Sequence, residues 1–157
     1  MVYPVLVPTT GNEYPNHINA KIRLKEILKT AGYKDIQFEV QQPTVMLKGL
    51  GERRYTADIQ ATKKRKKYIF EIDGMRGHSS RRNRAKDKTR DGALLKLKRR
   101  TIRLPTWWLV GEGKLSDREI LDEIEWQESI IQNSLGVQDV EIKNQKVLSD
   151  VLNVEQV

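Results

Sequence analysis

Three acidic residues in the middle of the chain are the side chains best suited to chemistry. Asp58 interrupts a run at residues 56–59 that otherwise resembles a buried strand, and Glu71 and Asp73 interrupt a second run at 69–73. Side chains alternate along a strand, so Glu71 and Asp73 point to the same side, and Asp58 can lie opposite them if the strands pair. Three carboxylates in one place repel one another and are costly to desolvate, so they need a compensating cation.

A hard divalent ion is the cation that such a cluster favours. The chain has no Cys and two His, so most available ligands are oxygen atoms, which Mg²⁺ and Mn²⁺ prefer. Such an ion polarises a phosphodiester, activates water and stabilises the leaving oxygen. The alternative interpretation is that the acids only balance neighbouring cations in a salt-bridge network.

The elements around these acids alternate between helix and strand. Helices are expected at residues 17–31, at about 80–98, and from the capping box formed by Ser116 and Glu119. Strands are expected at residues 3–7, 36–40, 44–47, 55–61, 68–72 and 101–104, with a turn at 49–52 and a basic hairpin tip at 63–67. The last 20 residues are expected to form a strand and a helix, with no function assigned. This order predicts an α/β fold with a mixed central sheet flanked by helices.

One domain with one core is the organisation expected for 157 residues. We expect it to fill residues 1–157, with its core at about 15–128 and a C-terminal extension at 137–157. No apolar run approaches the ~20 residues that span a bilayer, and residues 1–14 lack the features of a secretory signal. An intracellular, cytoplasmic protein without membrane contact is therefore expected. The absence of Cys excludes a disulfide scaffold, cysteine zinc sites and a thiol nucleophile.

Positive charge is concentrated in one stretch of the chain. The formal net charge is +8, but residues 63–104 hold 17 basic and 4 acidic side chains, a balance of +13, whereas residues 105–157 are at −7. Such a block attracts polyanions, which favours a nucleic acid as the partner. Contacts to its backbone are assigned to Lys64, Arg65 and Lys66 in the hairpin and to Arg81, Arg82, Arg84, Lys86 and Lys88 near the start of the second helix. Backbone contacts do not read bases, so little sequence specificity is expected.

Taken in order, these motifs resemble the PD-(D/E)XK nuclease superfamily. Asp58, a hairpin and Glu71-Ile72-Asp73 carry the general likeness. The likeness narrows to the very-short-patch repair endonuclease-like branch through Glu71-Ile72-Asp73-Gly74-x-x-x-His78, Asp87-x-x-Arg90-Asp91-x-x-x-Leu95 and Ile102-Arg103-Leu104-Pro105. His17-x-x-x-Lys21-x-x-Leu24, then Gly32 and Glu39, are similar to competence-associated and Holliday-junction-cleaving relatives. The resemblance covers about residues 15–128, and an archaeal virus or plasmid is one origin that it allows.

The resemblance implies a restriction-endonuclease-like fold and a Mg²⁺- or Mn²⁺-dependent deoxyribonuclease that hydrolyses DNA with low sequence specificity. Asp58 and Glu71 would ligate the metal, with Asp73 as a third ligand and His78 as a proton-transfer group. The lysine usual in the superfamily is replaced by Asp73. Lys21, Lys86 or Lys88 would then supply the missing cation from a helix, or the ion activates water without a lysine.

Several neighbouring residues are open to two interpretations. Asp87 and Asp91 share a helix face that either orients the active site or forms a surface salt-bridge array. His17 is expected to cap or pack the first helix, and Glu39 to approach the site. Trp107 and Trp108 could stack on bases, although we expect at least one in the core.

Two other classes of function are alternatives to the nuclease. One is a non-catalytic nucleic-acid-binding protein on a degenerate nuclease fold, which the missing lysine favours. The other is a protein-interaction module whose acidic C-terminal third docks a basic partner or covers its own basic face. A homodimer is one arrangement that the resemblance allows, and a viral chain would act in the host cytoplasm.

Overall fold

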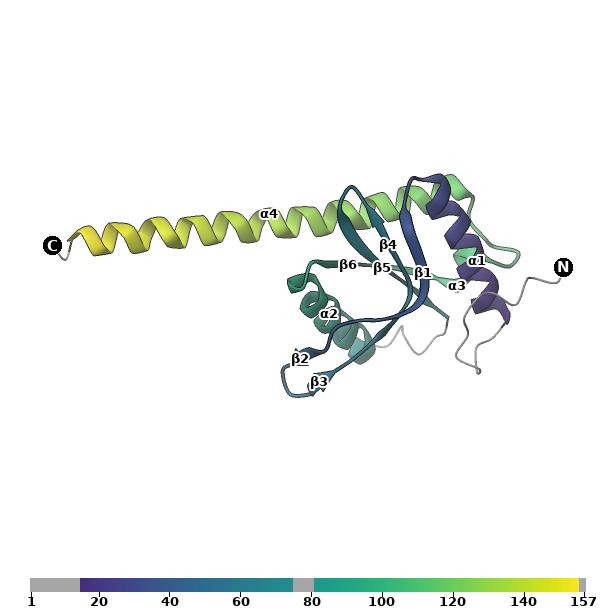
Figure 1. The fold of residues 1–157 in the computed structure, drawn as a ribbon, viewed down its shortest axis with the longest axis horizontal. Coiled ribbons are helices and arrows are strands. Elements are labelled where there is room, and N and C mark those ends of the chain that lie inside the picture. The colour runs from purple at the N-terminus through teal and green to yellow at the C-terminus, as the bar shows by residue number, and fades with distance from the viewer. Residues whose placement is uncertain (1–14, 75–80, 156–157) are drawn as a thin grey trace. The chain divides into compact units, whose positions relative to one another are not determined.

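A computed structural model describes residues 15–74 and 81–155 of the chain, without the side chains at 81–83, 137–143 and 147–155. The strand expected at residues 3–7 and the loop that holds His78 lie outside the described residues. Figure 1 shows the helices and strands, which in chain order are α1 (Pro15–Thr30), β1 (Lys34–Gln41), β2 (Val45–Leu47), β3 (Gly51–Arg53), β4 (Thr56–Lys63), β5 (Lys66–Asp73), α2 (Arg81–Lys96), β6 (Arg99–Pro105), α3 (Thr106–Leu109) and α4 (Asp117–Glu155).

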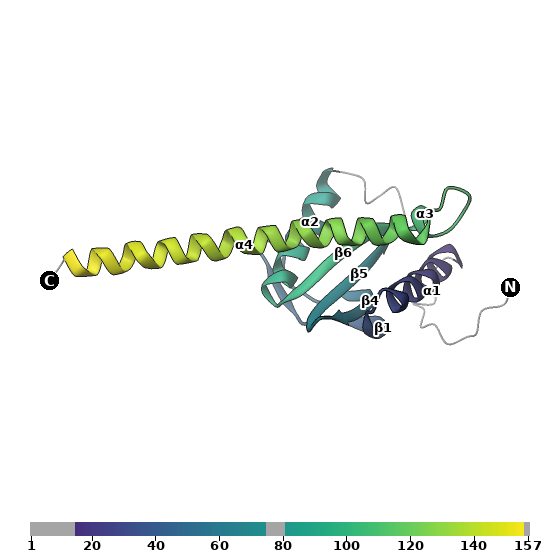
Figure 2. The same cartoon turned by 90° about the horizontal axis from the view of Figure 1, so that it is seen from above.

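A four-stranded mixed sheet forms the centre of this structure, in the strand order β1-β4-β5-β6. The first three strands are antiparallel, whereas β5 and β6 are parallel and are therefore joined by a crossover through α2. Helix α1 lies against one face of the sheet and α2 against the other (Figure 1 and Figure 2). The prediction of an α/β fold with a mixed sheet flanked by helices is confirmed at this level.

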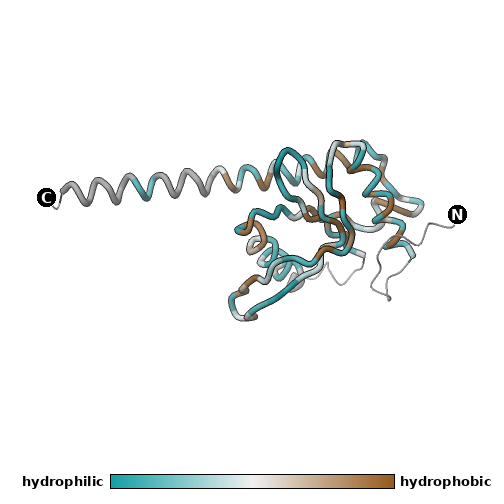
Figure 3. The backbone as a smooth tube through the Cα atoms, in the orientation of Figure 1, coloured by the Kyte–Doolittle hydropathy of each residue, from teal (hydrophilic) through white to brown (hydrophobic). Residues whose placement is uncertain are grey.

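Apolar residues fill the two layers between the sheet and its helices. On the side of α2, Leu94 packs with Ala57, Ile69 and the buried residues of β2. Elsewhere in the core, the Tyr33 ring meets Tyr68 and Phe70 edge-on, with centroids 5.4 and 5.5 Å apart. Figure 3 shows these apolar segments gathered on the central strands and on α1.

The hairpin between β4 and β5 is tighter than the sequence indicates. Lys63 pairs with Lys66, so the turn itself consists of Lys64 and Arg65 alone. Both have left-handed backbone, with φ of 50° and 66°, as a two-residue hairpin turn of the primed type requires. The predicted five-cation tip is therefore reduced to two exposed cations.

Three other expectations are corrected by the structure. Gly51 and Glu52, expected in a turn, begin the short strand β3. Helix α3 was not expected, and it follows directly from the end of β6. The strand expected within the last 20 residues is absent from the described part, where α4 runs continuously for 39 residues. The capping box is confirmed, because Ser116 and Glu119 exchange two hydrogen bonds of 3.1 Å at its start.

The chain divides into two compact units, residues 1–122 and residues 123–157. The first unit holds the sheet, α1 to α3 and the beginning of α4, whereas the second holds the rest of α4. Among the described helices, none combines the length and the apolar character that crossing a membrane needs.

Candidate active site

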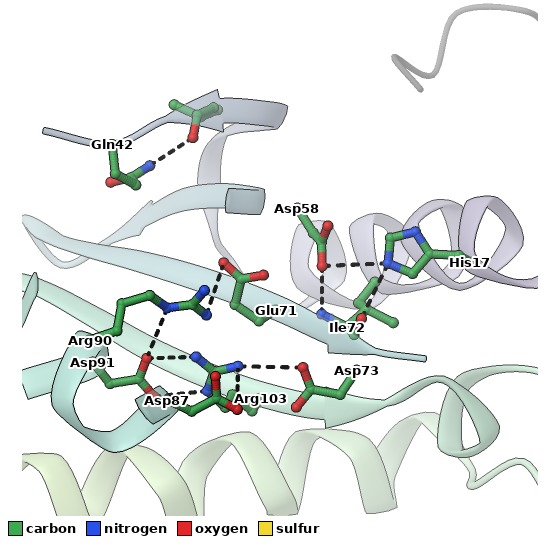
Figure 4. A network of polar contacts seen from close by, with 11 residues as sticks. His17, Gln42, Asp58, Glu71, Ile72, Asp73, Asp87, Arg90, Asp91 and Arg103 are labelled. Carbon is green, nitrogen blue, oxygen red and sulfur yellow. Dashed lines mark hydrogen bonds and ion pairs between the residues drawn. The ribbon is translucent and has the colours of Figure 1, made fainter. Parts of the chain in front are cut away.

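Asp58 lies where the ladder between β4 and β5 ends. The last backbone pair of that ladder joins Ile59 to Phe70, and beyond it the N–H of Ile72 donates instead to Asp58 Oδ2, at 2.7 Å (Figure 4). A carboxylate thus replaces the backbone acceptor that the neighbouring strand no longer supplies. The hydrogen bond fixes the Asp58 side chain at the opening between the strands.

His17, in the first turn of α1, reaches the same place. Its Nε2 donates to the carbonyl of Ile72 at 3.2 Å and lies 3.5 Å from Asp58 Oδ2. His17 thus packs against the sheet, and its contact with Asp58 goes beyond the capping or packing of its own helix that the sequence favours. Its position depends on a contact between residues 55 apart in the chain, which local patterns do not encode.

Lys21, one turn further along α1, is a fully buried cation. It forms a close ion pair with Glu39 of β1, whose backbone is held in the left-handed region at φ 50°. The register of β1 sets Glu39 directly across from Asp58, between the pairs Phe38–Ile59 and Val40–Ala57. Of the three lysines considered as the missing cation, Lys21 is the one beside the acids, whereas Lys86 and Lys88 are exposed on α2.

The Asp58 carboxyl is held in its charged form. Its burial favours the neutral form, but hydrogen bonds from His17 and Ile72 and the charges of His17 and Lys21 outweigh burial and lower its pKa below the ordinary 3.8. Asp58 is therefore ionised at neutral pH.

Glu71, on the next strand, is in the opposite situation. Its side chain is 14% exposed, and among the described residues it accepts no hydrogen bond; its ion pair with Arg90 Nη2 is 3.9 Å long. Burial and the nearby charge of Asp58 raise its pKa to about 8, against the opposing charges of Arg90 and Arg103. The structure thus brings Asp58 and Glu71 together with incomplete compensation of their charge.

The raised pKa of Glu71 predicts that this residue lowers the free energy of unfolding by an amount that depends on pH. Because its pKa rises from 4.5 to about 8 on folding, the folded state holds the extra proton between these values, so the free energy of unfolding falls as pH rises through this window. One pKa unit is worth about 1.36 kcal/mol. In EDTA, we expect Glu71→Gln to be more stable than the wild type by several kcal/mol at pH 9 and by little at pH 5, measured by urea unfolding. An equal difference at both pH values would contradict this.

Asp73 belongs to a network centred on Arg103 of β6, which Arg90 joins to Glu71 through a second ion pair of 3.8 Å with Asp91. The Arg103 guanidinium binds both carboxylate oxygens of Asp91 at 2.7 and 2.8 Å, and lies 3.4 Å from Asp73 and 3.6 Å from Asp87. Burial disfavours its charged form, but these carboxylates together raise its pKa. Asp87 and Asp91 therefore bind Arg103, the residue of β6 that faces Asp73, and do not form a salt-bridge array confined to the surface. Arg103 stands within the motif at residues 102–105 that carries the resemblance, but the motif-based assignment gives it no role.

The third metal ligand proposed from sequence is not assembled here. In the described ranges 15–74 and 81–155, no three His, Asp or Glu side chains stand together as a metal-binding group. The Asp73 carboxylate instead faces Arg103 (Figure 4). Asp58 and Glu71 remain as the two oxygen-bearing groups.

The basic residues assigned to nucleic acid lie in two separate places. Lys64 and Arg65 are exposed at the hairpin tip, six residues along β4 from Asp58, or roughly 20 Å at about 3.3 Å per residue. Lys66 is half-buried within β5. On α2, Arg84, Lys86 and Lys88 are exposed, while the side chains of Arg81 and Arg82 lie outside the described residues, as does His78.

Thr106, Gly74 and two tryptophans lie at or next to the end of β5 and β6. Thr106, nearly buried at the start of α3, donates to the carbonyl of Asp73 at 3.3 Å. A Cβ at Gly74 would stand 3.4 Å from the same hydroxyl, which is an ordinary van der Waals contact. Trp107 is 55% exposed and Trp108 half-buried, so neither belongs to the buried core.

A pair of carboxylates fits a divalent ion of the Mg²⁺ type. Such ions keep several waters and are usually held by one or two protein carboxylates together with substrate phosphates, so a third protein ligand is not required. Burial and the charge of Asp58 keep Glu71 protonated at neutral pH, and a bound cation would supply the positive charge that favours its ionised form. Comparison with protein-family models, curated proteins and solved structures finds no match to this chain.

Proposed function

We propose that this chain is a Mg²⁺- or Mn²⁺-dependent nuclease that hydrolyses DNA phosphodiester bonds with low sequence specificity, on a restriction-endonuclease-like variant of the α/β fold. The observation that carries the proposal is the meeting of Asp58 and Glu71 at the end of the β4–β5 ladder, with Lys21 buried beside them. Paired carboxylates and a cation are the groups that phosphodiester hydrolysis uses.

The residues around Asp58 and Glu71 would each have a distinct role in the reaction. Asp58 and Glu71 would hold the ion, which when bound polarises the phosphodiester and activates water. The hydrogen bond from Ile72 and the 3.5 Å contact with His17 hold the Asp58 carboxylate in place before any ligand arrives. His17 and Ile72 do most to keep Asp58 ionised, and the charge of Lys21 adds a smaller effect from α1, on the opposite side of the acids from the strand position that Asp73 occupies in place of a lysine.

DNA would be held by charge and not by base contacts. Arg84, Lys86 and Lys88 project from α2, the helix whose Arg90 reaches Glu71. Lys86 lies one helical turn before Arg90 on the same side of α2, and phosphate contacts there would position a strand. Lys64 and Arg65 are too far along β4 to touch the same phosphate as Glu71, so they would contact a more distant part of the DNA.

The decisive experiment is cleavage of linear and circular DNA, each single- and double-stranded, with Mg²⁺ or Mn²⁺ against EDTA. We expect metal-dependent degradation by the wild type and a loss of about 100-fold or more in Glu71→Ala, since the group that holds the ion is removed. Glu52→Ala, which removes an exposed glutamate from β3, is the matched control and should cleave as the wild type does.

Two results would contradict the nuclease. Cleavage by Glu71→Ala at the wild-type rate would show that Glu71 does not hold the ion. Salt-sensitive DNA binding without cleavage of any substrate would instead favour the non-catalytic binding protein. The ion pairs of Glu71 with Arg90 and of Asp73 with Arg103 are the observations that favour this second candidate.

A further inference from the structure

In its described residues, the second unit of the chain is one helix, the part of α4 from Glu123 to Glu155. Ile124 near its start is buried, but Trp126 and Ile130 are 59% and 47% exposed. No other described helix or strand belongs to this unit. A long helix with an apolar stripe gains most of its stability by packing that stripe against a partner.

The stripe that begins at Trp126 and Ile130 continues along α4 with a heptad spacing. From Trp126 to Val154 the steps alternate strictly between four and three residues. One set of heptad positions (a) is occupied by Ile130, Val137, Asn144 and Val151. The other set (d) is occupied by Trp126, Asn133, Val140, Val147 and Val154. All charged residues between 126 and 154 fall outside these positions.

This spacing is the signature of a left-handed coiled coil. Apolar residues every 3.5 positions keep one seam facing a partner helix along its length, provided that the repeat is sustained over three or four heptads. The stripe covers four heptads, about 43 Å of helix at about 1.5 Å per residue. Seven of its nine positions are apolar and two are Asn.

The two Asn indicate which helix is the partner. Asn at an a position, as at Asn144, is tolerated where it meets another Asn, and it then fixes the register. When two copies of this chain pair in parallel and in register, Asn133 meets Asn133 and Asn144 meets Asn144, while every apolar position meets itself. The antiparallel pairing that also matches the Asn, residue 133 against 144, sets Val154 against Glu123. Parallel self-pairing is thus the arrangement that satisfies all nine positions.

We propose that α4 beyond Glu123 binds the same segment of a second copy of this chain as a parallel, two-stranded coiled coil. The second unit then acts as a dimerisation helix, and the first unit, which carries the candidate active site, is present twice in each particle. The pairing is measured by mass and cross-linking, not by cleavage, so it stands or fails separately from the proposed function.

Sedimentation equilibrium of the full chain tests the pairing. We expect a particle of twice 18.2 kDa at micromolar concentrations. The double variant Val137→Glu/Val147→Glu places charges in the seam and should be monomeric. Gln138→Glu/Gln145→Glu adds the same two charges off the seam and should remain dimeric. A monomeric wild type at tens of micromolar, or a dimeric Val137→Glu/Val147→Glu variant, would overturn the proposal.

The orientation is tested by disulfide cross-linking, which is clean because the chain has no cysteine of its own. Asn144→Cys alone should form a covalent dimer rapidly under mild oxidation, since the two copies of residue 144 face each other in the parallel coil. Cross-linking that requires a mixture of Asn133→Cys and Asn144→Cys chains would show the antiparallel arrangement and overturn the parallel one.

Discussion

Replacing Lys21 with methionine is expected to reduce metal-dependent DNA cleavage by about 100-fold or more, because it removes the buried cation beside Asp58 while keeping the length of the side chain. The same change should also destabilise the protein by roughly 3–5 kcal/mol, since the Glu39 carboxylate loses its partner. Cleavage rates and urea unfolding measure the two effects.

A second replacement separates catalysis from stability. In Lys21→Met/Glu39→Gln the leftover carboxylate is neutral, so we expect most of the stability to return while cleavage stays low. Lys29→Met, which removes an exposed lysine from the last turn of α1, is the matched control and should change neither. If the double variant cleaves DNA at the wild-type rate, Lys21 stabilises the fold and takes no part in the reaction.

Replacing Arg103 with methionine is expected to give a large loss of stability. It leaves three carboxylates, on Asp73, Asp87 and Asp91, around a half-buried gap, and removing one partner of a buried network costs roughly 3–5 kcal/mol. Arg103→Lys should recover only part of this, because an ammonium group cannot bind Asp91 through two parallel hydrogen bonds. The midpoint of urea unfolding measures both losses.

The control for this prediction is an ion pair that is exposed at the surface instead of buried. Arg118 and Asp122 form an exposed pair of 2.9 Å on the first turns of α4, and Arg118→Met should cost less than about 1 kcal/mol. Adding Asp91→Asn to Arg103→Met should restore part of the stability by removing one unpaired charge. Equal losses in Arg103→Met and Arg118→Met would contradict the buried network.

The sequence predicts those parts of the fold that local patterns encode. Alternating apolar residues locate β1, β4 and β5, helical spacing locates α1, and the capping box marks where α4 begins. The same patterns single out Asp58 and Glu71, because acids in buried strands are conspicuous. These features depend on neighbours within a few residues, which is the range that periodicity and turn chemistry describe.

The rest of the site depends on contacts between distant residues. Lys21 and Glu39 are 18 positions apart, Asp73 and Arg103 are 30 apart, and His17 and Ile72 are 55 apart. No local pattern states which of many charged residues will meet across the sheet. The full length of α4 escapes the local patterns for a different reason: Gly136 and the many Val residues disfavour helix locally, whereas the heptad spacing extends over four heptads.

The two-residue turn between β4 and β5 also has a consequence for engineering. Lys64 and Arg65 adopt a left-handed backbone that side chains with a Cβ resist, at about 1–2 kcal/mol per residue, whereas Asn-Gly adopts it with little strain. The chain therefore has two exposed cations at this tip, although Asn-Gly would form a more stable turn there. Because the tip lies roughly 20 Å along the strands from Asp58, Asn-Gly at this position would raise thermostability without altering the two acids, but it would remove two of the cations assigned to DNA contact.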